Sequence, residues 1–223
     1  MRGLFVTGTD TGVGKTEVAV ALVAGWRARG LDVVGMKPAQ SGYTPGEESD
    51  AARIRAAGGG DDPEELVCPY AFAAPLAPAL AARVEGRAVS FDHVLACARE
   101  LLRRHAALLV EGAGGLLVPL TENRTFADLA WALGMPVLVV ARAGLGTVNH
   151  TALTCEILRV RGLEIRGVVL NRPTPASDPS EPYNAAEIER LTGVRVLDSL
   201  PHLADGAERA RRFAERLPAE VHF

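Results

Sequence analysis

Short apolar segments rich in valine and leucine alternate along the chain with longer segments whose apolar residues have helical spacing. The predicted strands are 3–6, 33–36, 107–110, 136–140 and 167–170, and the predicted helices are 17–29, 91–104, 147–161 and 185–191. The strand segments are continuously apolar rather than alternating, which is typical of strands buried on both faces. The pattern predicts a single α/β domain over residues 1–223, with a mostly parallel sheet flanked by helices.

Polar or small residues follow each predicted strand. The residue pairs at these strand ends are Thr7-Gly8, Lys37-Pro38, Glu111-Gly112, Ala141-Arg142 and Asn171-Arg172. Because ligands of parallel sheets bind at the carboxyl ends of the strands, these pairs predict a binding site along one edge of the sheet. Residues 43–69 and 173–183 lack periodicity, so surface loops or helix-flanking segments are expected there.

The segment TGTDTGVGKT, between the first predicted strand and the first predicted helix, ends like a phosphate-binding loop. In G-x-x-x-x-G-K-[ST] the first glycine stands five positions before the second. That position is Thr9 here, and Gly8 is one residue too far. Gly14-Lys15-Thr16 still opens a helix, where backbone N–H groups and the helix dipole hold phosphate oxygens, Lys15 would reach the terminal phosphates and Thr16 would ligate Mg²⁺. A P-loop NTPase-like nucleotide site is predicted; the alternative is a glycine-rich turn with an exposed lysine.

Two acids and a second lysine add to this prediction. Glu111, in VEGAGG, is suited to a hard cation held at the phosphate loop, although an acid there could simply start a turn. Asp50, in ESDAARI, is either a helix cap or a magnesium ligand. Lys37, in MKPAQSG, could neutralise charge on a transferred phosphoryl group, or be an ordinary solvated lysine. Gln40 and Ser41 follow on the same segment and could bind a substrate.

Other polar residues leave two interpretations open. Asn171 could contact an adenine edge or form a turn, and Asn149, in GLGTVNH, could cap a helix or contact a substrate. The five histidines lack the close spacing of a metal site. The three cysteines are widely spaced in apolar surroundings, which predicts buried structural thiols in a reducing compartment.

Composition excludes several classes of partner. The formal net charge of -3 gives no basic surface for nucleic acid or an anionic membrane. No apolar run approaches the ~20 residues of a membrane helix, and the chain starts without a positively charged leader. A cytoplasmic protein that binds neither nucleic acid nor membrane is expected.

Seven motifs, taken in order, resemble those of the dethiobiotin synthetases, the ATP-dependent ring-forming ligases of biotin biosynthesis. They are GTDTGVGKT, MKPAQSG, SDA, CPYAFAAPLAP, VEGAGGLLVPL, LGTVNH and VVLNRP. The resemblance implies a homodimer with its active site at the subunit interface. It also implies that 7,8-diaminononanoate, CO₂ and ATP with Mg²⁺ give dethiobiotin, ADP and phosphate, through a carbamate and a carbamic-phosphoric anhydride.

The resemblance also assigns residues by role. Lys37, Lys15 and Thr11 would be catalytic, and Thr16, Asp50 and Glu111 would bind Mg²⁺. ATP would contact Gly12, Val13, Gly14, Lys15, Thr16, Glu17, Asp50, Glu111, Gly112, Ala113, Gly114, Asn171, Arg172, Leu200, Pro201 and His202. The diamine and its carbamate would contact Thr11, Lys37, Ser41, Gly114, Gly115 and Leu145, together with Asn149 of the partner subunit.

Some positions depart from the family. Gly12 stands where many members carry glutamate, the position of His202 is often aromatic, and the segment after about Ala204 resembles no family motif. Two alternatives share the fold class. A partitioning-type switch ATPase would carry a lysine where this chain has Asp10, and a cobyrinate-type amidotransferase would need a glutaminase domain for which 223 residues leave no room.

Overall fold

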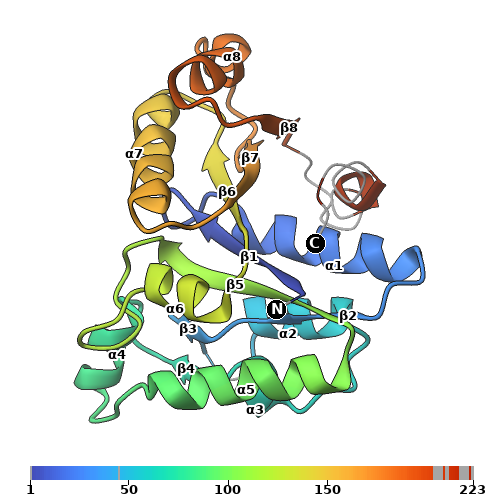
Figure 1. The fold of residues 1–223 in the computed structure, drawn as a ribbon, viewed down its shortest axis with the longest axis vertical. Coiled ribbons are helices and arrows are strands. Elements are labelled where there is room, and N and C mark those ends of the chain that lie inside the picture. Colours follow the sequence, from blue (N-terminus) through green and yellow to red (C-terminus); the bar gives the residue numbers. More distant parts are fainter. Residues whose placement is uncertain (1, 45, 203–207, 209–210, 216–220, 222–223) are drawn as a thin grey trace.

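The computed structural model describes residues 2–44, 46–202, 208, 211–215 and 221. Its centre is a six-stranded sheet with strand order β2-β5-β1-β6-β7-β8, in which every neighbouring pair is parallel (Figure 1). The strands are β1 (Gly3–Gly8), β2 (Val33–Met36), β5 (Ala107–Gly115), β6 (Val137–Arg142), β7 (Ile165–Asn171) and β8 (Val196–Leu200). A second, parallel pair is formed by β3 (Ala39–Ser41) and β4 (Tyr70–Phe72).

Helices cover both faces of the large sheet. The helices among the described residues up to 202 are α1 (Lys15–Ala28), α2 (Asp50–Ala57), α3 (Glu64–Val67), α4 (Pro78–Val84), α5 (Phe91–Arg104), α6 (Phe126–Leu133), α7 (Thr147–Val160) and α8 (Glu181–Thr192), of which α4 packs on the small β3–β4 pair. Buried residues of α5, α6, α7 and α8 form one core, and those of α1 and α2 form another on the opposite face.

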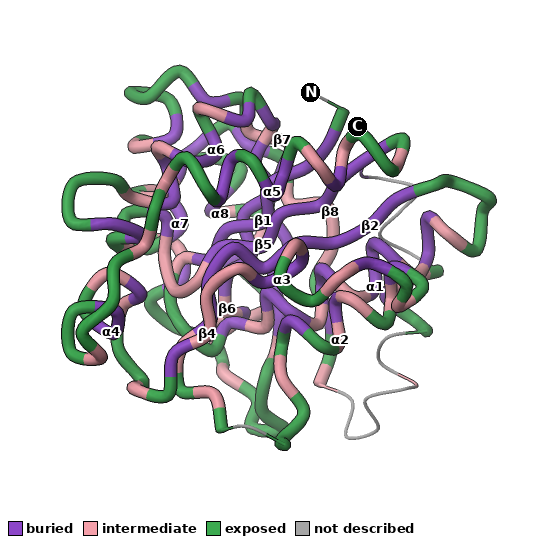
Figure 2. The backbone as a smooth tube through the Cα atoms, turned by 90° about the horizontal axis from the view of Figure 1, so that it is seen from below, coloured by how far each residue is buried: buried purple, intermediate pink, exposed green. Residues whose placement is uncertain are grey.

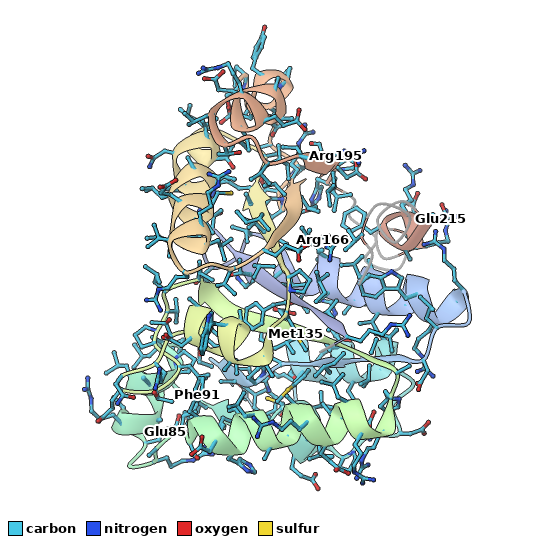
Figure 3. All side chains as sticks on the ribbon, viewed as in Figure 1. Glu85, Phe91, Met135, Arg166, Arg195 and Glu215 are labelled. Carbon is cyan, nitrogen blue, oxygen red and sulfur yellow. The ribbon has the colours of Figure 1, made fainter. Side chains whose placement is uncertain are left out.

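Successive residues of the central strands supply the two cores in turn. Phe5 packs with α5 to α8, while Leu4 and Val6 pack with α1 and α2. This explains why the strands are continuously apolar, because both faces are covered. Figure 2 shows the buried strands at the centre of the molecule, and Figure 3 shows that Met135 lies inside it whereas Glu215 points outward.

The predicted α/β class and parallel sheet are confirmed, and β2 and α5 have the predicted bounds. Three differences matter. β5 continues five residues further than predicted, to Gly115, and the region 43–69, where loops or helix-flanking segments were expected, contains α2, which begins at Asp50, and α3. β8 was not predicted because it is a partly exposed edge strand without a continuous apolar run.

The burial of the three cysteines agrees with their expected structural role. Cys68, Cys97 and Cys155 are all free and buried. Burial raises the pKa of the Cys68 thiol to about 12 and that of Cys155 to about 11, so both are protonated at neutral pH.

Within the described chain, none of the helices has the length and apolar character that a membrane crossing needs. Most of the segment after Ala204 lies outside the described residues.

Candidate active site

A cleft of about 620 Å³ lies at the carboxyl ends of the strands. Many of the predicted site residues line it: Thr11, Gly12, Gly14, Lys15, Thr16, Glu17, Lys37, Ser41, Asp50, Glu111, Ala113, Gly114 and Asn171. They come from the β1–α1 loop, the start of α1, the segment after β2, the start of α2, the end of β5 and the end of β7. Because these strands run parallel in one sheet, their carboxyl ends lie on the same edge and bring the residues together.

The loop between β1 and α1 has the geometry of an anion site. Gly14 is the N-cap of α1 with a φ of 94°, and it has no side chain that could accept a hydrogen bond from the first N–H groups of the helix. These N–H groups and the helix dipole are therefore available to a phosphate. A Cβ on Gly8 would lie 2.8 Å from the main-chain oxygen of Asp10 and 2.9 Å from the Nζ of Lys15. Gly8, which breaks the usual formula, is thus required where the loop folds back on the strand.

Lys15 is not the exposed lysine of a simple turn. It is 6% exposed, and its Nζ donates a hydrogen bond to the main-chain oxygen of Asp10 at 3.0 Å. Burial lowers the pKa of Lys15 to about 8, with the Glu111 carboxylate opposing and the Lys37 ammonium adding to this effect. The ammonium therefore already lies at the phosphate loop, held by a neutral acceptor.

Lys37 lies between two carboxylates. It is 3% exposed and donates to Glu111, to Asp50 at 3.1 Å and to the main-chain oxygen of Gly112 at 3.4 Å. Burial alone would lower the pKa of Lys37, but the combined attraction of the two carboxylates raises it. Lys37 is therefore a buried, charged lysine rather than a solvated one.

Glu111 is the most buried acid of the cleft. It has no exposed surface, and its Oε1 accepts a hydrogen bond from the Thr16 hydroxyl at 2.9 Å as well as the contact from Lys37. Its other oxygen, Oε2, is buried without a hydrogen-bond partner in the described part of the chain. A buried carboxylate oxygen normally has a partner, so this atom fits a bound cation.

Asp50 is not needed as a helix cap. Ser49 is the N-cap of α2, and its side chain accepts the Ala52 N–H at 3.0 Å. The Asp50 carboxylate instead faces Lys37 in the cleft. Burial would raise the pKa of Asp50, but the Lys37 ammonium outweighs it and lowers the pKa. Asp50 thus keeps an ionised carboxylate beside Glu111 and Thr16.

These three groups suit Mg²⁺, which binds one or two protein carboxylates and takes its remaining ligands from phosphate oxygens and water. Among the residues that the structure describes, no cluster of three or more His, Cys, Asp or Glu side chains could hold a metal ion by itself. That finding is compatible with a magnesium site completed by a nucleotide. It does not fit a metal ion held by the protein alone, such as structural zinc.

Asn171 holds the phosphate loop. It is 2% exposed, and its Nδ2 donates to the main-chain oxygen of Val13 at 2.9 Å. A Cβ on Gly14 would lie only 2.0 Å from that nitrogen, so glycine is needed at this position. The Oδ1 of Asn171 is buried without a partner among the described residues and can accept a hydrogen bond from a ligand.

The remaining predicted site residues do not line this cleft. They are Val13, Gly112, Gly115, Leu145, Asn149, Arg172, Leu200, Pro201 and His202. Arg172 forms an ion pair with Glu181. Leu145 is 77% exposed and Asn149 is exposed at the start of α7.

Sequence reasoning missed Arg53 and gave no role to the segment 75–78, although both line the cleft. Arg53 forms an ion pair with Glu17, with 2.8 Å between Nη1 and Oε1. A signal was present, since Arg53 follows Asp50 by three positions and so lies on the same side of α2. Residues 75–78 were recognisable only as part of the motif CPYAFAAPLAP.

Comparison with known proteins gives a consistent result. The family model described as AAA domain matches residues 2–209. An ATP-dependent dethiobiotin synthetase from Anaeromyxobacter dehalogenans (strain 2CP-C) is 67% identical over 223 residues, which is 100% of both chains. The chain belongs to the dethiobiotin synthetase family. A dethiobiotin synthetase from Bacillus thuringiensis (strain Al Hakam) is 44% identical over 202 residues, covering 90% of this chain and 84% of that one.

Solved structures of other proteins share the fold. A ParA family ATPase from Chlorobium tepidum TLS has a TM-score of 0.52 at 13% identity, covering 97% of this chain and 90% of that one. A chain of the MinC:MinD cell division protein complex of Aquifex aeolicus has a TM-score of 0.58 at 11% identity, covering 96% and 86%. At these identities the likeness shows the fold alone. The resemblance to dethiobiotin synthetases predicted from the motifs is confirmed, and the two alternatives are not favoured.

Proposed function

We propose that this protein is an ATP-dependent dethiobiotin synthetase. It would join CO₂ to 7,8-diaminononanoate and close the ureido ring, giving dethiobiotin, ADP and phosphate. The observation that carries this proposal is the 67% identity, over the whole of both chains, to a relative with that name. The buried lysines and acids at the phosphate loop supply the chemistry that such a reaction needs.

The reaction brings together groups of like charge. An anionic carbamate must attack an anionic γ-phosphate, so positive groups lower the repulsion between them. Lys15 and Lys37 are buried at the phosphate loop, where low dielectric makes their charges most effective. In our proposal both ammonium groups contact the γ-phosphoryl group, and Lys37 also contacts the carbamate.

The charges of the side chains that line the cleft sum to zero. Lys15, Lys37 and Arg53 oppose Glu17, Asp50 and Glu111, three positive against three negative. A bound triphosphate therefore adds negative charge that these six side chains do not neutralise. We propose that Thr16, Asp50 and Glu111 hold Mg²⁺, which would neutralise phosphate oxygens.

The two substrates would occupy different parts of the site. The phosphate loop, Gly12 to Glu17, together with Gly112, Ala113 and Gly114, would hold the phosphates of ATP. The free Oδ1 of Asn171 supports an adenine contact beside Arg172, Leu200, Pro201 and His202. Thr11, Ser41, Gly114 and Gly115 would contact the diamine and its carbamate.

The outer face of α7 supports the proposed homodimer. Leu153 and Val160 are 60% and 75% exposed, and Leu145 just before the helix is 77% exposed. Asn149 lies four residues before Leu153, so it shares this apolar face. Exposed apolar side chains gathered on one helix face are typical of a protein interface. We propose that this face meets the partner subunit, and that each subunit is a single cytoplasmic domain.

The function is tested by incubating the purified protein with Mg-ATP, bicarbonate and 7,8-diaminononanoate. We expect dethiobiotin by mass spectrometry and phosphate release that depends on the diamine. Reactions that lack either the diamine or bicarbonate are the controls. Phosphate release at the same rate with and without the diamine would contradict the proposal.

Subunit mixing tests the role of Asn149. Asn149→Ala is expected to raise the diamine KM, because the carboxylate of the diamine loses its contact across the interface. Unfolding and refolding this variant with Lys37→Met at equal concentration should restore about a quarter of the wild-type sites, since half of the dimers are mixed and each has one intact site. Activity at low diamine concentration measures the recovery.

The matched control mixes Asn149→Ala with a chain that carries both Asn149→Ala and Lys37→Met. No intact site can form in that mixture, so no recovery is expected. Equal activity in the two mixtures would show that Asn149 acts within its own subunit or not at all.

A further inference from the structure

An ion pair outside the predicted site joins the phosphate loop to the neighbouring strand. β6 lies next to β1 in the sheet, and the Thr9 N–H donates to the main-chain oxygen of Val140 at 3.0 Å. Arg142 is the last residue of β6, and its Nη2 lies 2.5 Å from the Oδ2 of Asp10. The sheet therefore places a guanidinium beside the front half of the loop.

Asp10 contacts Thr11 and Lys15, two residues of the phosphate loop that the proposed reaction uses. Its Oδ1 accepts the Thr11 N–H at 2.7 Å, and its main-chain oxygen accepts the Lys15 ammonium at 3.0 Å. The third contact, from Oδ2 to Arg142, ties this arrangement to β6. Gly12 follows with a φ of 72° and nothing within 4 Å of its Cβ position, so packing does not hold that side of the loop.

We propose that Asp10 and Arg142 form a positioning pair that fixes Thr11 toward the diamine and Lys15 toward the phosphates. The inference rests on the proposed function, because it uses the assignment of Thr11 to the diamine. Neither residue of the pair lines the cleft, so they act through Thr11 and Lys15 rather than on the reacting atoms. The front half of the loop is longer than the usual formula by one residue, and the pair supplies the anchor that this longer segment needs.

The pair contributes little to the stability of the fold. The Arg142 and Asp10 side chains are 40% and 50% exposed, and ion pairs at such positions are screened by solvent. The pair affects catalysis through the positions of Thr11 and Lys15, because small displacements of a catalytic group lower turnover strongly. Loss of the pair should therefore change kinetic constants while the melting temperature stays the same.

The experiment compares Asp10→Asn, Arg142→Gln and the double variant in steady-state assays with both substrates. Asn at position 10 can still accept the Thr11 N–H, so this variant removes mainly the charge pair. We expect the diamine KM to rise on the order of tenfold in each single variant, and to rise more than the ATP KM. Because the two residues act as a unit, the double variant should be no worse than either single variant.

Two further variants serve as comparisons. Arg142→Lys retains a cation at the end of β6 and should recover most of the lost affinity for the diamine. Arg103→Gln breaks an ion pair with Glu100 that is also largely exposed but lies on α5, and it should leave all kinetic constants unchanged. Melting temperatures of all variants are measured in parallel.

The outcomes separate the two proposals. Wild-type protein that forms no dethiobiotin would overturn the proposed function and this inference with it. If the wild type is active, unchanged diamine KM values, multiplied effects in the double variant, equal changes in both KM values, or a matching fall in melting temperature would each overturn the positioning pair alone.

Discussion

Lys37→Met is expected to lower kcat on the order of 10³-fold, the cost of removing a preorganised positive group from a transition state. Its ammonium is the one that lies between Asp50 and Glu111, while the Lys15 ammonium is bonded to Asp10. Among the described residues that line the cleft, Arg53 is the remaining cation, and its guanidinium is paired with Glu17. Single-turnover measurements with saturating ATP and diamine would report the loss directly.

The same change should also destabilise the protein, by about 3–5 kcal/mol, because it leaves the buried Glu111 carboxylate without its ion-pair partner. The double variant Lys37→Met with Glu111→Gln removes that charge and should regain much of the stability without regaining activity. Urea unfolding measures the first quantity and kcat the second. A Lys37→Met protein with kcat within about tenfold of wild type would remove Lys37 from the catalytic groups.

Gly8→Ala is expected to abolish productive ATP binding, with at least a hundredfold fall in kcat/KM for ATP, on the order of the loss caused by misplacing a catalytic group. The added Cβ would lie 2.8 Å from the main-chain oxygen of Asp10, which cannot move without shifting the loop. It would also lie 2.9 Å from the Nζ of Lys15 and 3.0 Å from the Cγ2 of Val13. The methyl group thus occupies the space in which the loop and its lysine meet.

Gly12→Ala is the matched comparison for this prediction. Its Cβ would have nothing within 4 Å, so the cost is limited to the positive φ of 72°, about 1–2 kcal/mol for a residue with a side chain. We expect this variant to retain measurable ATP binding in isothermal titration calorimetry under conditions in which Gly8→Ala shows none. Similar losses in the two variants would show that backbone strain, rather than the contact at Gly8, controls the loop.

Much of the site could be predicted because it lies at strand ends. Lys37, Glu111 and Asn171 each follow or end an apolar run, and the rule for parallel sheets places them on one edge. The strand order β2-β5-β1, which makes Lys37 and Glu111 neighbours of the phosphate loop, is a property of tertiary packing. The sequence pattern contains no information on that order.

Other features could not be predicted for local reasons. The sequence does not distinguish a buried lysine from a solvated one, because the burial of Lys37 depends on its tertiary contacts with Asp50 at the start of α2 and with Glu111 of β5. The ion pair between Asp10 and Arg142 joins residues 132 positions apart, and nothing near either residue indicates the other.

The balance of charge in the cleft affects how ligands arrive. Three cationic and three anionic side chains line it, so together they produce little net field at a distance. Association of a nucleotide then depends on short-range contacts rather than on long-range steering. Salt screens interactions between exposed charges that are farther apart than a Debye length, about 10 Å at 0.1 M salt, whereas it has little effect on close contacts. An association that depends on close contacts is therefore nearly insensitive to ionic strength. The on-rate of Mg-ATP should therefore change little between low and physiological salt.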